Sequence, residues 1–237
     1  MPIIYPYRVA TTKRHGNIAI LTLIPVNEAN RISSFTPGQH LVLTVFNEFK
    51  VKLGSRPFTI ISLPNEDGRI ELAIKIYQGF TKHIEELKPN DLVELSSPIA
   101  GWANDFFSHE NIVCLAGGTG ITPFLCLARE LAAKNLPNQL LVINSNKKRA
   151  DIIQEQELNE LSEQHPNFQI LETLTEETPA TWLGALGRID AKMISQFASP
   201  LKNKTFYLCG PKSFIVAMKE TLEELNVLPE KIIFPNL

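Results

Sequence analysis

A glycine-rich turn, Gly117-Gly118-Thr119-Gly120, follows an apolar stretch and precedes a segment with apolar residues at helical spacing. Glycines have no side chain, so a ligand can approach the backbone closely, and a helix start presents unpaired N–H groups to an anion. With Thr122 expected as N-cap and Pro123 as the first helical residue, the segment predicts a phosphate or pyrophosphate site. The alternative is a tight turn without a ligand, because Pro123 stands where the third glycine of the G-x-G-x-x-G pattern would be.

A second turn, Cys209-Gly210-Pro211, ends another apolar stretch. Ligands of open parallel sheets bind at the carboxyl ends of strands, so Cys209 is expected to face the same crevice as the glycine turn. The alternative for Cys209 is a small buried apolar residue, and that interpretation is preferred for Cys114 and Cys126.

In the first half of the chain, Arg56-Pro57-Phe58-Thr59 opens a predicted strand. An arginine offers a fork of donors suited to a phosphate, a phenylalanine a flat face for a ring, and a threonine a hydroxyl donor. Side chains alternate along a strand, so Arg56 and Phe58 should point one way and Pro57 and Thr59 the other. The alternative is a solvated arginine before an ordinary strand.

A second anion site is predicted at Gly79-Phe80-Thr81, before a short helix expected over residues 81–87. Here the alternative is a plain helix with Thr81 as its N-cap.

The elements that must position these residues change rhythm along the chain. The first half has short apolar stretches separated by turn residues, which favours an antiparallel barrel or sandwich. The second half alternates strands and helices, which predicts a parallel sheet covered on both faces. The boundary is predicted near residues 100–110, giving domains 1–105 and 106–237. Strands are expected at 18–24, 40–46, 58–62, 70–77, 92–95, 111–116, 140–143, 168–174, 205–208 and 232–234, and helices at 123–134, 151–163, 191–197 and 212–225.

Composition excludes several classes of protein. The chain has 237 residues, a net charge of −2 and 44% hydrophobic residues, which is typical of a folded protein without the basic excess of nucleic-acid binders. No apolar run approaches the roughly 20 residues of a membrane span, and the N-terminal segment has no apolar signal core, so a cytoplasmic location is expected. The cysteines have no C-x-x-C spacing and the histidines no metal-ligand spacing, so we expect reduced thiols and no metal.

Taken in order, these motifs resemble those of the ferredoxin–NADP reductase superfamily. The family carries Arg-x-Tyr/Phe-Ser/Thr, Gly-x-x-Ser/Thr, Gly-Gly-x-Gly-Ile-Thr-Pro and Cys-Gly-Pro, which here correspond to residues 56–59, 79–81, 117–123 and 209–211. The second match, Gly-Phe-Thr, is one residue shorter than the family motif. Residues 37–40, Pro-Gly-Gln-His, are similar to a further family segment. The resemblance covers nearly the whole chain.

The resemblance implies a fold of class β + α/β: an antiparallel six-stranded flavin-binding barrel followed by a doubly wound parallel-sheet nucleotide-binding domain. It implies a flavin-dependent NAD(P)H reductase that passes electrons from NADH or NADPH through FAD, rather than FMN, to a redox protein. Thr59, near the reactive flavin nitrogen, and Cys209, beside the nicotinamide, are the implied catalytic residues. The implied cofactor-binding residues are Arg56, Pro57, Phe58, Thr59, Ile74, Lys75, Tyr77, Gly79, Phe80, Thr81, Gly118, Thr119, Gly120, Thr122, Pro123, Cys209, Gly210 and Pro211.

Several points stay open at this stage. Pro235 and Leu237 depart from the family's terminal Glu-x-Phe, and Phe234 is a candidate to shield the flavin. The basic loop at 147–149 could meet the 2′-phosphate of NADPH or be solvated. The acceptor could be a ferredoxin, flavodoxin, cytochrome, oxygenase component or free flavin. Two alternative functions remain: an electron-transfer subunit of a larger redox complex, and an NAD(P)H:free-flavin reductase.

Overall fold

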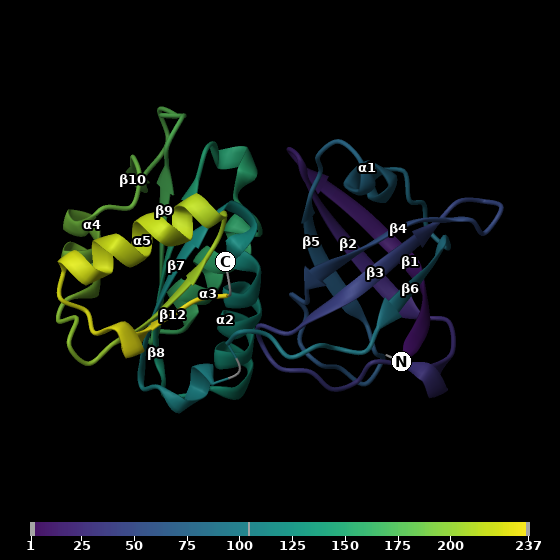
Figure 1. Ribbon diagram of the computed structural model, residues 1–237, viewed down its shortest axis with the longest axis horizontal. Coiled ribbons are helices and arrows are strands. Elements are labelled where there is room, and N and C mark those ends of the chain that lie inside the picture. The colour runs from purple at the N-terminus through teal and green to yellow at the C-terminus, as the bar shows by residue number, and fades with distance from the viewer. Residues whose placement is uncertain (1–2, 104, 236–237) are drawn as a thin grey trace. The chain divides into compact units, whose positions relative to one another are not determined.

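The chain divides into two compact units, Met1–Asn104 and Asp105–Leu237, in a computed structural model that describes residues 3–103 and 105–235 (Figure 1). Each unit has its own buried apolar cluster. The units are therefore described separately below. Within the described residues, no helix is long and apolar enough to span a bilayer.

The first unit is an antiparallel sheet of six strands in the order β4-β3-β6-β1-β2-β5. An isolated bridge between Ile60 and Leu72, and a 2.9 Å hydrogen bond from the Ile61 N–H to the Glu71 carbonyl, connect the end of β4 to β5 and close the sheet into a barrel. The elements are β1 (Ile4–His15), β2 (Ile18–Pro25), η1 (Glu28–Asn30), β3 (His40–Phe46), β4 (Lys52–Thr59), β5 (Ile70–Lys75), α1 (Phe80–Glu85) and β6 (Leu92–Ser96).

In this unit one strand is missing from the sequence prediction, and the predicted bounds of another are wrong. The strand β1 was not predicted, because in its sequence only Tyr7 and Val9 are buried and the apolar alternation is weak. The strand predicted at residues 58–62 instead spans Lys52–Thr59, which places Arg56 inside the strand. It begins early because Asn47 Oδ1 accepts hydrogen bonds from the backbone N–H groups of Phe49 and Val51 and orders the preceding hairpin turn.

The second unit is a parallel sheet of six strands in the order β10-β9-β8-β7-β11-β12. Its strands are β7 (Asn111–Gly117), β8 (Gln139–Asn146), β9 (Phe168–Leu174), β10 (Ala185–Leu186), β11 (Thr205–Cys209) and β12 (Ile232–Ile233). Its helices are α2 (Thr122–Lys134), α3 (Glu155–Gln164), α4 (Ala191–Ala198) and α5 (Lys212–Glu224), with 3₁₀ turns η2 (Phe106–Ser108), η3 (Gly118–Ile121), η4 (Arg149–Asp151) and η5 (Pro229–Lys231).

Helices cover both faces of this sheet, with α4 and α5 on one side and α2 and α3 on the other (Figure 1). Alternate strand residues such as Val113 and Leu115 pack with Ile194 and Ile215 of α4 and α5. The predicted fold class, an antiparallel barrel followed by a doubly wound parallel sheet, is confirmed. The strand order reverses between β7 and β11, and this switch point is where open parallel sheets bind ligands.

Candidate functional site

The two glycine turns of the second unit meet at the switch point. Strands β7 and β11 are neighbours, and Cys209 is paired with Ala116. The turns that follow the two strands therefore leave the sheet at the same edge. A Cβ atom on Gly120 would overlap the backbone carbonyl of Cys209, which shows that the turns touch backbone to backbone. Glycine at position 120 is therefore required by packing between the two turns.

Gly118 differs from its neighbours. Its φ of +57° lies in the left-handed region, and a Cβ atom added there would meet nothing within 4 Å. By contrast, a Cβ atom added to Gly117 would lie 3.0 Å from the ring of Phe214, and one added to Gly210 would lie 2.8 Å from it. The open space beside Gly118 thus marks the side of the turn that a ligand can approach, and the turn there fits a phosphate group.

The predicted cap of α2 is wrong. Thr122 has helical backbone angles (φ −55°, ψ −44°), and its hydroxyl donates a 3.0 Å hydrogen bond back to the Thr119 carbonyl. The 3₁₀ turn η3 leads directly into α2, so Ile121 is the N-cap and Pro123 is the second helical residue. The helical N–H groups nearest the glycine turn therefore belong to η3 rather than to a threonine-capped helix.

Cys209 is partly buried at the end of β11. Desolvation raises the pKa of its thiol to about 12, and a hydrogen bond with the Gly210 backbone opposes that rise. The thiol is thus neutral near pH 7, which makes it a packing and orienting group instead of a nucleophile. Cys114 and Cys126 are buried, as predicted.

In the barrel, Arg56 and Phe58 point to the same side, as predicted. Both contact the ring of Phe80, the first residue of α1: the Phe58 and Phe80 rings lie 6.4 Å apart and 20° from parallel, and the Arg56 Cζ lies 5.6 Å from the Phe80 ring centre. Gly54, two residues earlier, makes room, since a Cβ there would lie 2.6 Å from the Phe80 ring. These residues form what we call the Phe80 cluster: Gly54, Arg56, Phe58 and Phe80.

The guanidinium of Arg56 is exposed and is oriented by a 2.8 Å hydrogen bond from its Nη1 to the Ser55 carbonyl. Phe58 is half-buried against the barrel core. A cation fixed by one backbone contact beside an aromatic face is an arrangement that can hold a phosphate and a ring of one ligand.

Thr81 is not an N-cap, contrary to one of the two predictions for it. Gly79 holds that position, with a φ of +81° and nothing within 4 Å of an added Cβ. The Thr81 hydroxyl instead closes a loop on Tyr77: it accepts a 2.7 Å hydrogen bond from the Tyr77 N–H and donates a 3.1 Å bond to the Tyr77 carbonyl. Gly79 therefore offers open backbone, while Thr81 fixes the turn that carries it.

Of the other predicted barrel residues, Pro57 and Thr59 lie on β4, Ile74 and Lys75 on β5, and Tyr77 in the turn after β5. Thr59 pairs with His40 and Pro57 with Val42, both on β3. Ile74 has its side chain in the barrel core, so it can offer a ligand only its backbone. Lys75 pairs with Ile18 at the end of β5, and the Tyr77 side chain is 63% exposed.

Two of the three cations in the basic loop after β8 are paired with carboxylates. Lys147 Nζ lies 2.7 Å from Glu176, and Arg149 Nε lies 2.9 Å from Glu155. The Arg149 guanidinium also lies over Trp182, with its Cζ 5.8 Å from the ring centre, and the Arg149 N–H donates to Glu177. These contacts leave Lys147 and Arg149 with less positive charge to offer a further phosphate.

Sequence reasoning missed a buried polar group near this edge. Glu172 on β9 lies between Asn144 and Asn146 of β8 and is only 8% exposed. Its signal in the sequence was a single carboxylate inside the apolar stretch 168–174 and two asparagines at alternate positions of β8.

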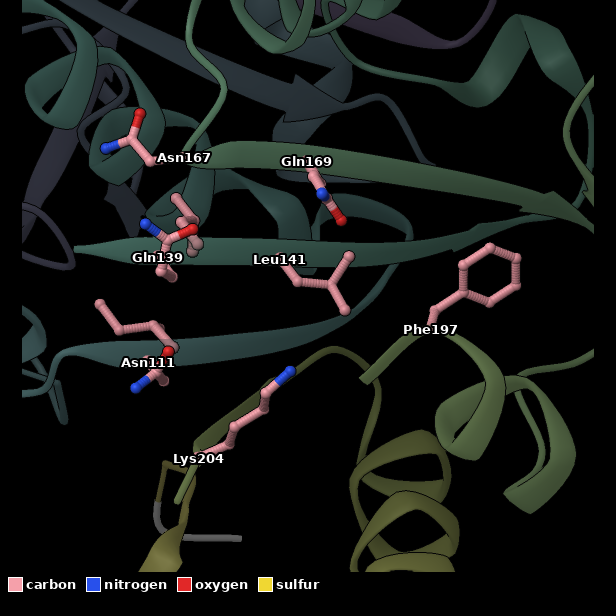
Figure 2. Close-up of a pocket in the computed structure, with 9 residues that line it drawn as sticks. Asn111, Gln139, Leu141, Asn167, Gln169, Phe197 and Lys204 are labelled. Atoms are coloured by element: carbon pink, nitrogen blue, oxygen red, sulfur yellow. The ribbon is translucent and has the colours of Figure 1, made fainter. Parts of the chain in front are cut away.

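A hollow of about 170 Å³ lies at the opposite edge of the sheet, at the amino ends of β7, β8 and β9 (Figure 2). Burial lowers the pKa of the Lys204 amine that points into it. No predicted site residue lines the hollow, whose lining residues are Asn111, Ile112, Gln139, Leu140, Leu141, Asn167, Gln169, Phe197 and Lys204. It is smaller than the roughly 300 Å³ of an ordinary small-molecule site.

Two further expectations concern metals and the C-terminus. Across residues 3–103 and 105–235, no three His, Cys, Asp or Glu side chains gather as a metal ion would require. Phe234 packs against the apolar core of the second unit, while Leu237 lies outside the described residues.

Comparison with known proteins identifies both units. Residues 10–103 match the family model of the oxidoreductase FAD-binding domain, and residues 114–220 match that of the oxidoreductase NAD-binding domain. The chain is 32% identical over 198 residues to NADH-cytochrome b5 reductase 1 of Aspergillus terreus, covering 80% of this chain and 67% of that protein. It spans only 56% of NADH-cytochrome b5 reductase 2 of Debaryomyces hansenii, to which it is 32% identical over 169 residues, or 69% of this chain.

Solved structures share the fold. The FAD/NAD-binding domain of nitric oxide dioxygenase from Vibrio cholerae superposes with a TM-score of 0.85 at 18% identity, with 97% of each chain covered. A ferredoxin–NADP⁺ reductase from Neisseria gonorrhoeae superposes with a TM-score of 0.81 at 17% identity, with 98% of each chain covered. The chain is therefore a member of the ferredoxin–NADP reductase superfamily, built from an FAD-binding barrel and an NAD-binding α/β domain.

Proposed function

We propose that this chain is a flavin-dependent NADH oxidoreductase. It would accept a hydride, and with it two electrons, from NADH and pass the electrons to a redox protein. The observation that carries the proposal is the switch point, where the Gly117–Gly120 and Cys209–Gly210 turns meet and leave Gly118 open to a ligand. The matched family models and the relatives named NADH-cytochrome b5 reductase support it. A b-type cytochrome is accordingly the first acceptor to test.

The barrel residues fit FAD. Arg56 would bind a flavin phosphate, and Phe58 would lie against the isoalloxazine ring. The open backbone of Gly79 would receive the pyrophosphate, with Thr81 holding the turn. Thr59 would donate its hydroxyl proton toward the ring, and the backbone of Ile74 to Tyr77 would line it. The bound flavin supplies the redox chemistry, accepting a hydride and releasing electrons to the partner.

In the second unit, the N–H groups of Gly118, Thr119 and Gly120 would bind the pyrophosphate of the nicotinamide dinucleotide. The Thr122 hydroxyl, whose proton is given to the Thr119 carbonyl, would be left as an acceptor. Cys209 would pack beside the nicotinamide as a neutral thiol, with Gly210 and Pro211 setting its backbone. These contacts would orient the transferred hydrogen. They include no proton donor, and a hydride transfer does not need one.

The loop after β8 favours NADH over NADPH. Lys147 and Arg149 are already paired with Glu176 and Glu155, so a 2′-phosphate would have to compete with those carboxylates. Removing the paired carboxylate should free the cation. Glu176→Gln is therefore expected to raise activity with NADPH relative to NADH, measured as the ratio of kcat/KM values.

The proposal is tested on the purified chain supplied with FAD. NADH added without oxygen should bleach the flavin absorbance, and subsequent addition of oxidised cytochrome b5 should restore it at a saturable rate. Ferredoxin, flavodoxin and free flavin are assayed in parallel, which separates a protein reductase from a free-flavin reductase. A chain that binds no FAD, or whose FAD is not reduced by either nicotinamide, would contradict the proposal.

A cytoplasmic location is proposed as well, because Cys114, Cys126 and Cys209 are all free thiols, as expected in a reducing compartment. Fractionation of cells expressing the tagged full-length protein tests this: recovery in the membrane or secreted fraction would contradict it.

A further inference from the structure

Glu172 is a buried carboxyl group, and no cation pairs with it within residues 3–103 and 105–235. It is 8% exposed, and Asn144 and Asn146 beside it are 0% and 4% exposed. Asn144 Nδ2 donates a 3.0 Å hydrogen bond to Glu172 Oε1, and Asn146 Nδ2 donates a longer, 3.5 Å bond to Oε2. Among the described residues, the Oδ1 atoms of both asparagines have no hydrogen-bond partner. Two orphaned buried oxygens next to a carboxyl group call for a proton donor.

Burial raises the pKa of Glu172 to about 8, while the two asparagine amides act to lower it. The charged side chains on the surrounding elements do not favour ionisation. Glu155 on α3 adds negative charge, and Glu157 on α3 is occupied by Arg129 of α2. On the adjoining loops, Lys147 and Arg149 are held by Glu176 and Glu155. The carboxyl group is thus protonated near neutral pH.

The cluster has two self-consistent hydrogen-bond arrangements. When Glu172 is ionised, both asparagine amides donate to it, as the distances above describe. When Glu172 is neutral, its O–H can donate to Asn146 Oδ1 after that amide turns over, which satisfies one orphaned oxygen. The choice between the two arrangements depends on a single proton.

This cluster lies behind the dinucleotide edge. Glu172 pairs with Asn144, and Asn144 pairs with Ala116, which leads into the glycine turn. Asn146 is the last residue of β8, and its carbonyl accepts hydrogen bonds from the Thr175 N–H and hydroxyl at 2.9 and 3.3 Å. Two strand spacings, or about 10 Å, separate β9 from β7, so a charge on Glu172 acts on the anion site through the protein interior.

We propose that the neutral form of Glu172 sets the affinity of this edge for the nicotinamide dinucleotide, and that ionisation of Glu172 weakens binding. The inference rests on the proposed function, since it concerns the same dinucleotide. A neutral acid does not repel the two negative charges of a pyrophosphate, whereas a buried carboxylate does. Glu172 is a positioning residue in this account, because it acts through the sheet and not by touching the ligand.

The test is NAD⁺ binding to the FAD-loaded full-length protein by calorimetry, at pH 6.5 and pH 9.5. The unmodified protein should bind roughly tenfold more weakly at the higher pH. Glu172→Gln, which keeps a neutral group of the same shape, should bind with the same affinity at both. Glu163→Gln, a control on the exposed side of α3, should keep the dependence of the unmodified protein. A dependence that survives in Glu172→Gln, or its absence from the unmodified protein, would overturn the proposal.

A second measurement needs no variant. The infrared C=O band of a neutral carboxylic acid should persist at pH 6.5, where exposed carboxylates are ionised, and disappear at pH 9.5. Because linkage is reciprocal, bound NAD⁺ should retain the band to a higher pH. A band that is absent at pH 6.5 or unmoved by NAD⁺ would refute the proposal. Failure of the unmodified protein to bind NAD⁺ at pH 6.5 would instead contradict the proposed function itself.

Discussion

Two glycines of the turn at the switch point differ in their surroundings. Gly120 is fixed by the backbone of Cys209, whereas Gly118 has a positive φ with open space beside it. A side chain at position 120 must therefore disturb the fold, and one at position 118 would intrude on the proposed dinucleotide site. Under this proposal the same residue type serves packing at one position and recognition two residues away.

Gly118→Ala separates these tasks. We expect the variant to fold, at a cost of about 1 kcal/mol for a left-handed alanine, and to bind NAD⁺ at least about tenfold more weakly. Gly16→Ala has a similar φ of 55°, lies in the β1–β2 hairpin and serves as the control for backbone strain. Calorimetry of NAD⁺ binding and urea unfolding measure the two effects. Equal affinities for the two variants would show that Gly118 is not at the ligand.

Arg56 provides a matching prediction for the barrel. Its exposed guanidinium should contribute a charge-assisted hydrogen bond to FAD, so Arg56→Ala is expected to weaken FAD binding by roughly tenfold to a hundredfold. Arg56→Lys should recover only part, because an ammonium lacks the planar fork. Retained flavin after gel filtration is the measurement. Arg69→Ala, at an exposed position before β5, should retain the flavin of the unmodified protein.

Cys209 is predicted to act by packing. Because burial raises the pKa of its thiol to about 12, flavin reduction should show no ionisation of this group between pH 6 and pH 9. Cys209→Ala should slow reduction by NADH by about tenfold with FAD retained, since the nicotinamide loses a neighbour that orients it. Stopped-flow absorbance measures the rate at several pH values. If the flavin of Cys209→Ala is reduced at the rate of the unmodified protein, Cys209 packs within the sheet and does not orient the nicotinamide.

At the scale of elements, β4 and α1 are joined by the Phe80 cluster. A strand must present a glycine at position 54 for the first residue of α1 to lie against Arg56 and Phe58. The turn that carries Phe80 is in turn closed by the two hydrogen bonds between Thr81 and Tyr77. The helix therefore sets the direction of the predicted flavin-binding side chains from outside their own strand.

Gly54→Ala tests this coupling. The added Cβ would lie 2.6 Å from the Phe80 ring, so we expect a loss of about 1–3 kcal/mol in the free energy of unfolding and weaker FAD binding. Adding Phe80→Ala should remove the overlap, so the double variant should be more stable than the sum of the two single effects predicts. Urea unfolding of all four proteins completes the cycle. Strictly additive effects would mean that overlap with the Phe80 ring is not the cause of the destabilisation by Gly54→Ala.

The sequence predicted elements well where apolar residues repeat without interruption. The bounds of β3 and β9 match those predicted, and the side shared by Arg56 and Phe58 followed from strand alternation. The strand β1 was missed because only a minority of its residues are buried. The cap of α2 was wrong because a 3₁₀ turn precedes the helix, and hydrogen bonds of this kind depend on backbone angles that residue types do not specify.

The Glu172 cluster could not be predicted for a different reason. A carboxylate within residues 168–174 would ordinarily lie on a solvent-facing side of the strand, but in a parallel sheet both faces are covered by helices. Only the pairing of β8 with β9 shows that Asn144 and Glu172 lie side by side. Long-range pairing of this kind is a property of topology and is absent from any local pattern.

At the scale of the whole molecule, Glu172 links stability to pH. Its pKa is raised by burial to about 8 in the folded chain, from 4.5 as the ordinary value, so between these pH values the folded state binds the proton and the unfolded state does not. The contribution of Glu172 to the free energy of unfolding is therefore fully present below pH 4.5. It falls as the pH rises toward 8 and is lost above that pH. The predicted loss across this window is on the order of 3 kcal/mol for a buried acid.

Glu172→Gln should remove this contribution, because a glutamine keeps the shape and has no proton to lose. We expect the variant to gain stability over the unmodified protein as the pH rises from 5 to 8, by on the order of 3 kcal/mol, when the FAD-loaded full chain is unfolded in urea. Glu163→Gln, exposed on α3, should follow the unmodified protein at every pH. If the stability difference between Glu172→Gln and the unmodified protein were constant across this range, Glu172 would have to be ionised in the folded state. The two asparagine amides would then suffice to hold a buried charge, and the orphaned Oδ1 atoms of Asn144 and Asn146 would need another donor.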